Sequence, residues 1–218
     1  MLRDAVSHLA SRLFDCFTVR NLLVQALVIP LTYALVVSGA DWAFFEWTRH
    51  VDLHWLIYLA GIGGFFVPIL LPVALYVWGE ICDQVRMRNA GVAVFQASAL
   101  GWVVSSTYKA FTGRTQPEFL TSFGTTDISG AFHFGFWQNG IFWGWPSSHT
   151  AVAVAGMVAL AYVLPHSRLT RYGGFAYALM VATGAAIGFH WLSDVLAGAL
   201  VGGVIGHVVG SSLSAEEK

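Results

Sequence analysis

The stretch HWLIYLAGIGGFFVPILLPVALYVWG, residues 54–79, contains no charged side chain and is rich in Leu, Ile, Val, Phe and Trp. An α-helix that crosses the roughly 30 Å hydrocarbon core of a bilayer needs about 20 consecutive apolar residues. The stretch is therefore long enough to span a membrane. The composition of the whole chain agrees, because 56% of the 218 residues are hydrophobic and 11% are charged, whereas a soluble domain has about 25% charged residues.

Five further runs have a similar length and composition: residues 21–40, 89–108, 146–164, 172–189 and 190–210, the last of which contains Asp194. We therefore predict an all-α fold in which six transmembrane helices form one bundle over residues 21–210, with a tail at 211–218. Residues 1–20 are predicted to form an amphipathic helix on the membrane surface, because apolar residues recur there at helical spacing: Leu2, Val6, Leu9, Leu13 and Phe17.

The positive residues are distributed unevenly between the two sides of this predicted bundle. With the N-terminus inside, the outer segments hold Arg49, Lys109 and Arg114, and the cytoplasmic segments hold the others: Arg3, Arg12, Arg20, Arg86, Arg88, Arg168, Arg171 and Lys218. Because cytoplasmic loops carry an excess of Lys and Arg, this distribution predicts that both termini are cytoplasmic. The net charge of -1 gives no indication of nucleic-acid binding. Cys16 and Cys82 indicate neither a disulfide framework nor a metal cluster.

Two features are expected to serve packing and anchoring. In the long outer loop at 110–145, Trp137, Trp143 and Trp145 are expected at the membrane interface. In the last helix, glycines at four-residue spacing are expected to let a neighbouring helix approach closely: Gly198, Gly202, Gly206 and Gly210.

Three polar clusters fall on the predicted outer side of the membrane. They are KAFTGRTQP (109–117), PSSH (146–149) and HWLSD (190–194). Asp194 is the one acidic residue within any of the six runs, and ionisable residues inside a membrane are usually functional. Four residues separate it from His190, so both side chains are expected on one helix face. The carboxylate would accept a proton from one ring nitrogen and leave the other as a nucleophile or base; the alternative is a structural hydrogen bond between helices.

The PSSH cluster has the composition of a helix start that binds an anion. Proline suits the first helical turn and serine caps free N–H groups, and a helix N-terminus favours phosphate. Ser147 and Ser148 are therefore candidate phosphate ligands, although an ordinary N-cap explains the serines equally well without explaining His149. Lys109 and Arg114 would add positive charge, or would contact lipid head groups. Together the clusters predict a phosphate site with one histidine that attacks and another that protonates the leaving group.

The order of these clusters resembles the type 2 phosphatidic acid phosphatase superfamily, the lipid phosphate phosphatases. Its motifs are Lys-x6-Arg-Pro, Pro-Ser-Gly-His and Ser-Arg-x5-His-x3-Asp, and their spacing matches residues 109–194. The resemblance implies that His190 is the nucleophile that forms a phosphohistidine and that Asp194 orients it. It also implies that His149 protonates the leaving alkoxide, that Lys109 and the start of the fourth helix hold phosphate oxygens, and that no metal or other cofactor is needed.

The chain departs from the family motifs at several positions. Gln116 replaces the arginine of the first motif and is kept as a candidate phosphate ligand at that position. Ser148 replaces a glycine, and Thr183 and Gly184 replace the Ser-Arg of the third motif. Two phosphate-binding arginines are thus missing, and Arg114 is expected to take over part of the role at position 116. Because a phosphomonoester carries close to two negative charges and a diester one, the thinner set of cations would suit a phosphodiester substrate or a transferase better.

Three functions are compatible with these patterns. We favour a membrane phosphatase that hydrolyses a lipid phosphate or diphosphate on the outer face of the cell membrane, the inner membrane of a bacterium. The alternatives are a transferase that moves a phospho-head-group to a lipid hydroxyl, and a transporter or lipid-binding protein without catalysis. The expected partners are the phosphorylated lipid and the membrane; the sequence identifies no protein partner.

Overall fold

The computed structural model describes residues 6, 8–53, 55–117, 126–138, 140–142 and 144–216. This part of the chain contains helices and no strand, which confirms the all-α prediction. The helices are α2 (Leu9–Asp15), α3 (Val19–Ala26), α4 (Val28–Val37), α5 (Ala40–Thr48), α6 (Trp55–Ile81), α7 (Val85–Thr112), α8 (Ser148–Val163), α9 (Arg168–Gly188) and α10 (Leu192–Glu216).

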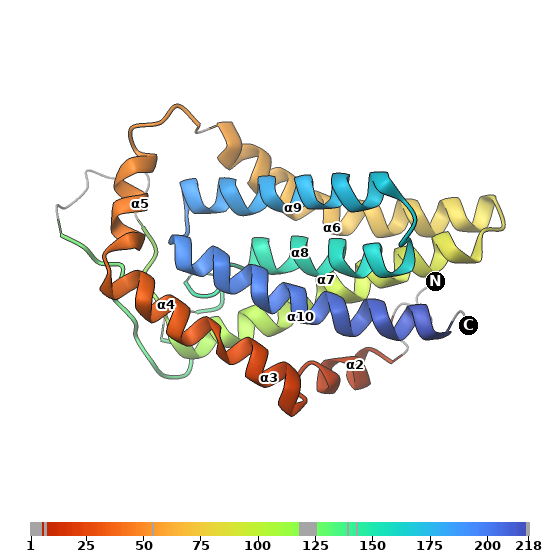
Figure 1. Ribbon diagram of the computed structural model, residues 1–218, viewed down its shortest axis with the longest axis horizontal. Helices are drawn as coiled ribbons and strands as arrows, with labels where there is room; N and C mark the ends of the chain where they lie inside the picture. Colours follow the sequence, from red (N-terminus) through yellow and green to blue (C-terminus); the bar gives the residue numbers. More distant parts are fainter. Residues whose placement is uncertain are drawn as a thin grey trace.

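The long helices α6 to α10 run side by side along the long axis of the molecule, and α5 crosses one end (Figure 1). Helix α8 packs against α6, α7, α9 and α10. Each predicted run lies on helix, and among the described residues four segments are long and apolar enough to cross a membrane: Val19–Val37, Trp55–Ile81, Val85–Thr112 and Leu192–Ala215. Helix α8 is shorter, at 16 residues, and α9 is not among the four, so a bundle of six spans stays a prediction.

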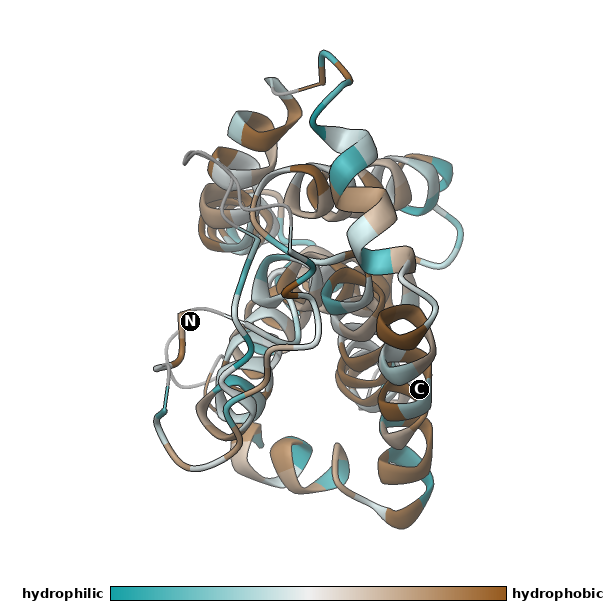
Figure 2. Cartoon of the chain, turned by 90° about the vertical axis from the view of Figure 1, so that its left-hand side faces the viewer, coloured by the Kyte–Doolittle hydropathy of each residue, from teal (hydrophilic) through white to brown (hydrophobic). Residues whose placement is uncertain are grey.

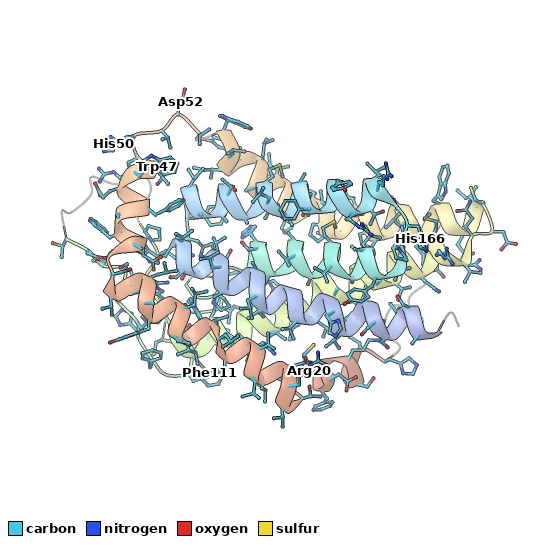
Figure 3. All side chains as sticks on the ribbon, viewed as in Figure 1. Arg20, Trp47, His50, Asp52, Phe111 and His166 are labelled. Carbon is cyan, nitrogen blue, oxygen red and sulfur yellow. The ribbon has the colours of Figure 1, made fainter. Side chains whose placement is uncertain are left out.

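Large apolar side chains cover the outward faces of the bundle. Helix α6 exposes Phe65, Ile69 and Trp78 by about half or more of their area, and hydrophobic colour covers outward faces of the bundle in the end view (Figure 2). Such extensive apolar surface is typical of a face that contacts lipid. His50 and Asp52 lie beside α5 at one end of the bundle, and His166 lies toward the other end (Figure 3).

The glycine stripe of α10 makes the predicted close approach to a neighbouring helix, which is α8. A Cβ atom at Gly198 would lie 2.4 Å from the carbonyl oxygen of Ser147, and one at Gly202 would lie 2.4 Å from that of Ala151. Gly206 and Gly210 make similar approaches to the same helix. The absence of side chains at these four positions therefore lets the two backbones come close together.

The first predicted run does not form one straight helix. It divides into α3 and α4 next to Leu27, and Gly39 then adopts a left-handed conformation with φ +72°. This turn redirects the chain into α5, where the sequence suggested a short connection over residues 41–53. Because α5 lies across the end of the bundle (Figure 1), its residues reach the ends of α9 and α10.

Several other expectations need correction. Arg12, expected at the cytoplasmic surface, is buried, and its guanidinium donates to Gln96 and Ser212 of α7 and α10. Trp145 is 7% exposed and its indole N–H donates to Thr32, so it is packed inside and does not anchor the interface. Leu2, Arg3, residues 118–125, Trp143 and Lys218 were also part of the predictions and lie outside the described residues.

Candidate active site

The three polar clusters predicted from the sequence come together at the α5 end of the bundle. The backbone N–H of Ser147 donates to the carbonyl oxygen of Asp194 at 2.9 Å, which joins the starts of α8 and α10. The indole N–H of Trp191 donates to the carbonyl oxygen of Thr115 at 2.8 Å, which ties the first cluster to the third. Segments distant in sequence thus form one site.

His190 and Asp194 form a buried pair. Nδ1 of His190 lies 3.2 Å from Oδ2 of Asp194, and the side chains are 2% and 0% exposed. Helix α10 begins at Leu192, so His190 precedes the helix and the two side chains do not share a helix face as expected. They meet because Oδ2 of Asp194 also accepts from the backbone N–H of Trp191 at 3.2 Å, which folds the chain back over the helix start.

The imidazole of His190 is held in its neutral form. Burial and the nearby positive charge of Lys109 lower the pKa of His190 to about 4, although the hydrogen bond to Asp194 opposes this shift. Because a carboxylate only accepts hydrogen bonds, Nδ1 must carry the ring proton. Nε2 is then left with its lone pair, which is the form that a nucleophile requires.

Gln116 lies next to the same ring nitrogen. Its side-chain amide is 3.3 Å from Nδ1 of His190. Since the single Nδ1 hydrogen points toward Asp194, an amide N–H cannot also donate to that nitrogen. The amide group of Gln116 is thus available for another acceptor beside the ring.

Lys109, Ser148 and His149 line a common cavity of about 430 Å³. The other lining residues are mainly apolar and come mostly from α6, α7 and α8. They include Phe65, Ile69 and Phe95. The Lys109 side chain is buried, with Nζ 3.4 Å from the carbonyl oxygen of Phe142. The cavity therefore has a polar end with one cation and a hydrocarbon-like remainder.

The rings of both histidines pack against the ring of Phe189. Its centroid lies 5.1 Å from that of His149 and 5.3 Å from that of His190. His190 is not part of the cavity lining, whereas His149 is. The two imidazoles therefore share one aromatic neighbour, and His149 is the one that lines the cavity.

The two serines at the start of α8 have different surroundings. The hydroxyl of Ser147 accepts from the backbone N–H of Thr150 at 3.4 Å, which makes it the N-cap of the helix. The hydroxyl of Ser148 accepts from that of Ser105 at 2.9 Å and faces the cavity. The ordinary N-cap interpretation thus accounts for the Ser147 side chain.

Arg114 lies neither at the phosphate-binding position nor at the lipid head groups, the two places that the sequence suggested. Gly113 ends α7 with φ +50°, and the chain then directs the Arg114 side chain into the protein, where it is 0% exposed. Its guanidinium donates to Asp194, to Ser193 at 2.7 Å, to Asp41 at 2.7 Å and to the carbonyl oxygen of Ser129. The N–H groups of the guanidinium are thus used by partners within the protein, and the burial of the side chain excludes contact with lipid head groups.

Asp41 of α5 is a site residue that the sequence did not reveal. It is fully buried and binds both Arg114 and Ser193. The one signal in the sequence was an acidic residue immediately after the first apolar run. Among the described residues, no cluster of three or more His, Cys, Asp or Glu side chains is arranged to hold a metal ion.

The fold and the site together define an all-helical, membrane-type protein with a histidine–carboxylate pair beside a lysine and a second histidine. The PAP2 superfamily matches residues 90–216, and the chain belongs to this superfamily. The structure is also similar to the crystal structure of a transmembrane PAP2-type phosphatidylglycerolphosphate phosphatase from Bacillus subtilis. The TM-score is 0.63 and the identity 18%, over 90% of this chain and 96% of that chain. No curated protein matches the sequence.

Proposed function

We propose that the protein is an integral membrane phosphatase that removes phosphate from a lipid phosphate or diphosphate through a phosphohistidine at His190. One observation carries this proposal: the ring of His190, paired with Asp194, packs against Phe189, and Phe189 packs against His149, which lines a cavity together with Lys109 and mainly apolar side chains. A lipid phosphate has the same division between a charged group and a hydrocarbon chain. Membership of the PAP2 superfamily supports the assignment.

The first chemical step uses the two histidines. Nε2 of His190 attacks phosphorus, and the new P–N bond forms as the P–O bond to the lipid breaks. The negative charge of the bound phosphate favours the protonated form of His149, and this form donates its proton to the departing oxygen, so the lipid leaves as an alcohol. Asp194 stabilises the positive charge that develops on the His190 ring. Lys109 and the backbone N–H groups of the first turn of α8 hold the phosphate oxygens.

The second step restores the enzyme. A water molecule attacks phosphorus and gives its proton to His149, while the P–N bond breaks and returns the electron pair to Nε2. Inorganic phosphate leaves, and His190 is neutral again. The side chains of this site supply every proton transfer in the cycle.

A second candidate function is a transferase in which a lipid hydroxyl replaces water. The charge balance of the site favours it, because Arg114 is paired with both Asp41 and Asp194. Within the described part of the chain, Lys109 is the cation that lines the cavity. One cation matches a singly charged phosphodiester better than a doubly charged monoester.

We further propose that the site faces the outside of a bacterial inner membrane. The α5 end of the bundle holds the site, and the excess of Lys and Arg at the other end supports a cytoplasmic location for that end. A substrate in the outer leaflet would then enter from the bilayer.

Phosphate release from a panel of lipid phosphates by the purified protein in lipid nanodiscs, with and without an acceptor lipid, tests these proposals. The phosphatase account expects inorganic phosphate from the wild type and from His166→Ala, a control at the far end of the bundle, and none from His190→Ala. It also expects the rate to survive a metal chelator. Product formed only when the acceptor lipid is present would favour the transferase, and no turnover under any condition would favour a non-catalytic lipid-binding protein.

A further inference from the structure

The side chain of Asp41 is a buried carboxylate that the two chemical steps do not use. Oδ1 accepts from the backbone N–H of Ser193 at 2.8 Å, and Oδ2 accepts from the Ser193 hydroxyl at 2.5 Å and from Arg114 at 2.7 Å. The residue is 0% exposed. A buried charge is expensive unless it is paired and hydrogen-bonded, and here it is both.

Helix α5 is fixed over the site by aromatic contacts. The ring of Trp191 lies 6.3 Å from that of Trp42 and 5.5 Å from that of Phe45, between ring centroids. Trp191 follows His190 directly in the chain. The helix that carries Asp41 is therefore packed against the residue next to the proposed nucleophile.

Arg114 links Asp41 to Asp194. One terminal nitrogen binds Asp41, and the other binds Asp194 and the Ser193 hydroxyl. The guanidinium is also in contact with the ring of Trp191, 5.7 Å from its centroid. Because the guanidinium is planar and rigid, the carboxylate on one side fixes the direction of the hydrogen bond on the other.

The link ends at the ring of His190. Oδ1 of Asp194 faces Arg114, and Oδ2 faces Nδ1 of His190. The chain of contacts is thus Asp41, Arg114, Asp194 and His190. Asp41 also shares the positive charge of Arg114, so that Asp194 keeps more of its negative charge for the imidazole.

We infer that Asp41 is a positioning residue for the phosphatase reaction, which acts through Arg114 and Asp194 to orient His190 and stabilise its positive form. This inference rests on the proposed function of the site. It assigns a catalytic contribution to α5, a helix outside residues 90–216, the range that the superfamily matches. Arg114 is also a positioning residue in this chain of contacts, and it does not bind phosphate itself.

Asp41→Asn keeps the shape of the side chain and removes its charge. We expect kcat to fall about tenfold to a hundredfold, the size of a lost charge-assisted hydrogen bond, with KM nearly unchanged. In an Asp194→Asn background the same substitution should have almost no effect, because the residue through which it acts is already neutral. Glu46→Gln, which removes a partly exposed carboxylate that pairs with Arg49 on the same helix, is the matched control and should leave kcat as in the wild type.

The outcomes are separable. A folded Asp41→Asn protein with wild-type kcat, or with an equal loss of kcat in both backgrounds, would overturn the inference. If Asp41→Asn does not fold, Ser193→Ala decides, because it removes the hydroxyl that donates to Asp41 and accepts from Arg114. A kcat within twofold of the wild type would overturn the inference, whereas a severalfold loss at constant KM supports it. A wild-type protein without activity on any lipid phosphate would overturn the proposed function and this inference together.

Discussion

Ser147 and Asp194 are joined by a backbone hydrogen bond of 2.9 Å between the N–H of the first and the carbonyl oxygen of the second. Ser147 caps α8, which carries His149, and Asp194 lies in the first turn of α10, which follows His190. The distance between the two histidines is therefore set by how closely these helices pack. The glycines of α10 let that distance be short.

We expect Gly198→Ala to disturb the site through this packing. Its Cβ would lie 2.4 Å from the carbonyl oxygen of Ser147, so the helices must separate. Overpacking of this kind costs about 1–3 kcal/mol, and the thermal unfolding midpoint should fall together with a loss of at least about tenfold in kcat. Gly203→Ala is the control on the same helix, because nothing lies within 4 Å of its Cβ position. Equal effects of the two substitutions would contradict the close-packing account.

Gln116→Arg tests how the charge of the site selects the substrate. Gln116 lies next to His190, so an arginine there would add a second cation near the phosphate. If the native substrate is a monoester, KM for a lipid phosphate should fall, because the added charge binds the second negative charge, and kcat should be kept. Gln116→Met controls for the lost amide. Depressed turnover of the native lipid, with a shift of preference from diesters to monoesters, would instead support the transferase.

Cysteine labelling tests the orientation of the bundle. In a Cys82→Ser background, which removes the exposed native thiol, Phe134→Cys should react with an impermeant thiol reagent applied to intact cells. Leu169→Cys should not, because the bundle places it at the other membrane face. Phe134 and Leu169 are 75% and 84% exposed, so accessibility within the protein does not separate them. The reverse labelling would place the site in the cytoplasm.

The lowered pKa of His190 makes a prediction about acidic pH. A pKa near 4 keeps the neutral nucleophile present throughout the range above about pH 5, and it is lost as the pH falls through 4. The acid limb of kcat/KM should then follow the second ionisation of the phosphate group, near pH 6. Two lipid phosphates whose second pKa values differ by about one unit should show limbs that differ equally. If the acid limb of kcat/KM instead lies near pH 6.5 for both substrates, His190 has the pKa of an ordinary histidine.

The sequence was sufficient to predict the helical class and the groups that lie at the site. Runs of apolar residues define helices whatever their partners, and polar residues at the ends of such runs stand out against their surroundings. Lys109, His149, His190 and Asp194 were found in this way. The spacing of the α10 glycines likewise predicted a close approach, although not that α8 was the partner.

Asp41 and the place of Arg114 could not be predicted, because they depend on contacts between distant segments. Asp41 lies 73 residues from Arg114 and 152 from Ser193 in the chain. A lone aspartate among aromatic residues at the end of an apolar run has the same pattern as an ordinary surface residue. The turn at Gly39 carries α5 over the site, and local sequence does not specify the direction of such a turn.

The central claim is that phosphate is transferred to His190, and trapping the intermediate tests it most directly. The protein is mixed with a lipid labelled in its phosphate group and quenched within milliseconds in alkali, in which phosphohistidine survives. Peptide mass spectrometry then locates the label. We predict phosphate on His190 in the wild type and its absence in His190→Ala, which should also release no inorganic phosphate. Label on another residue, or turnover that persists in His190→Ala, would contradict the account.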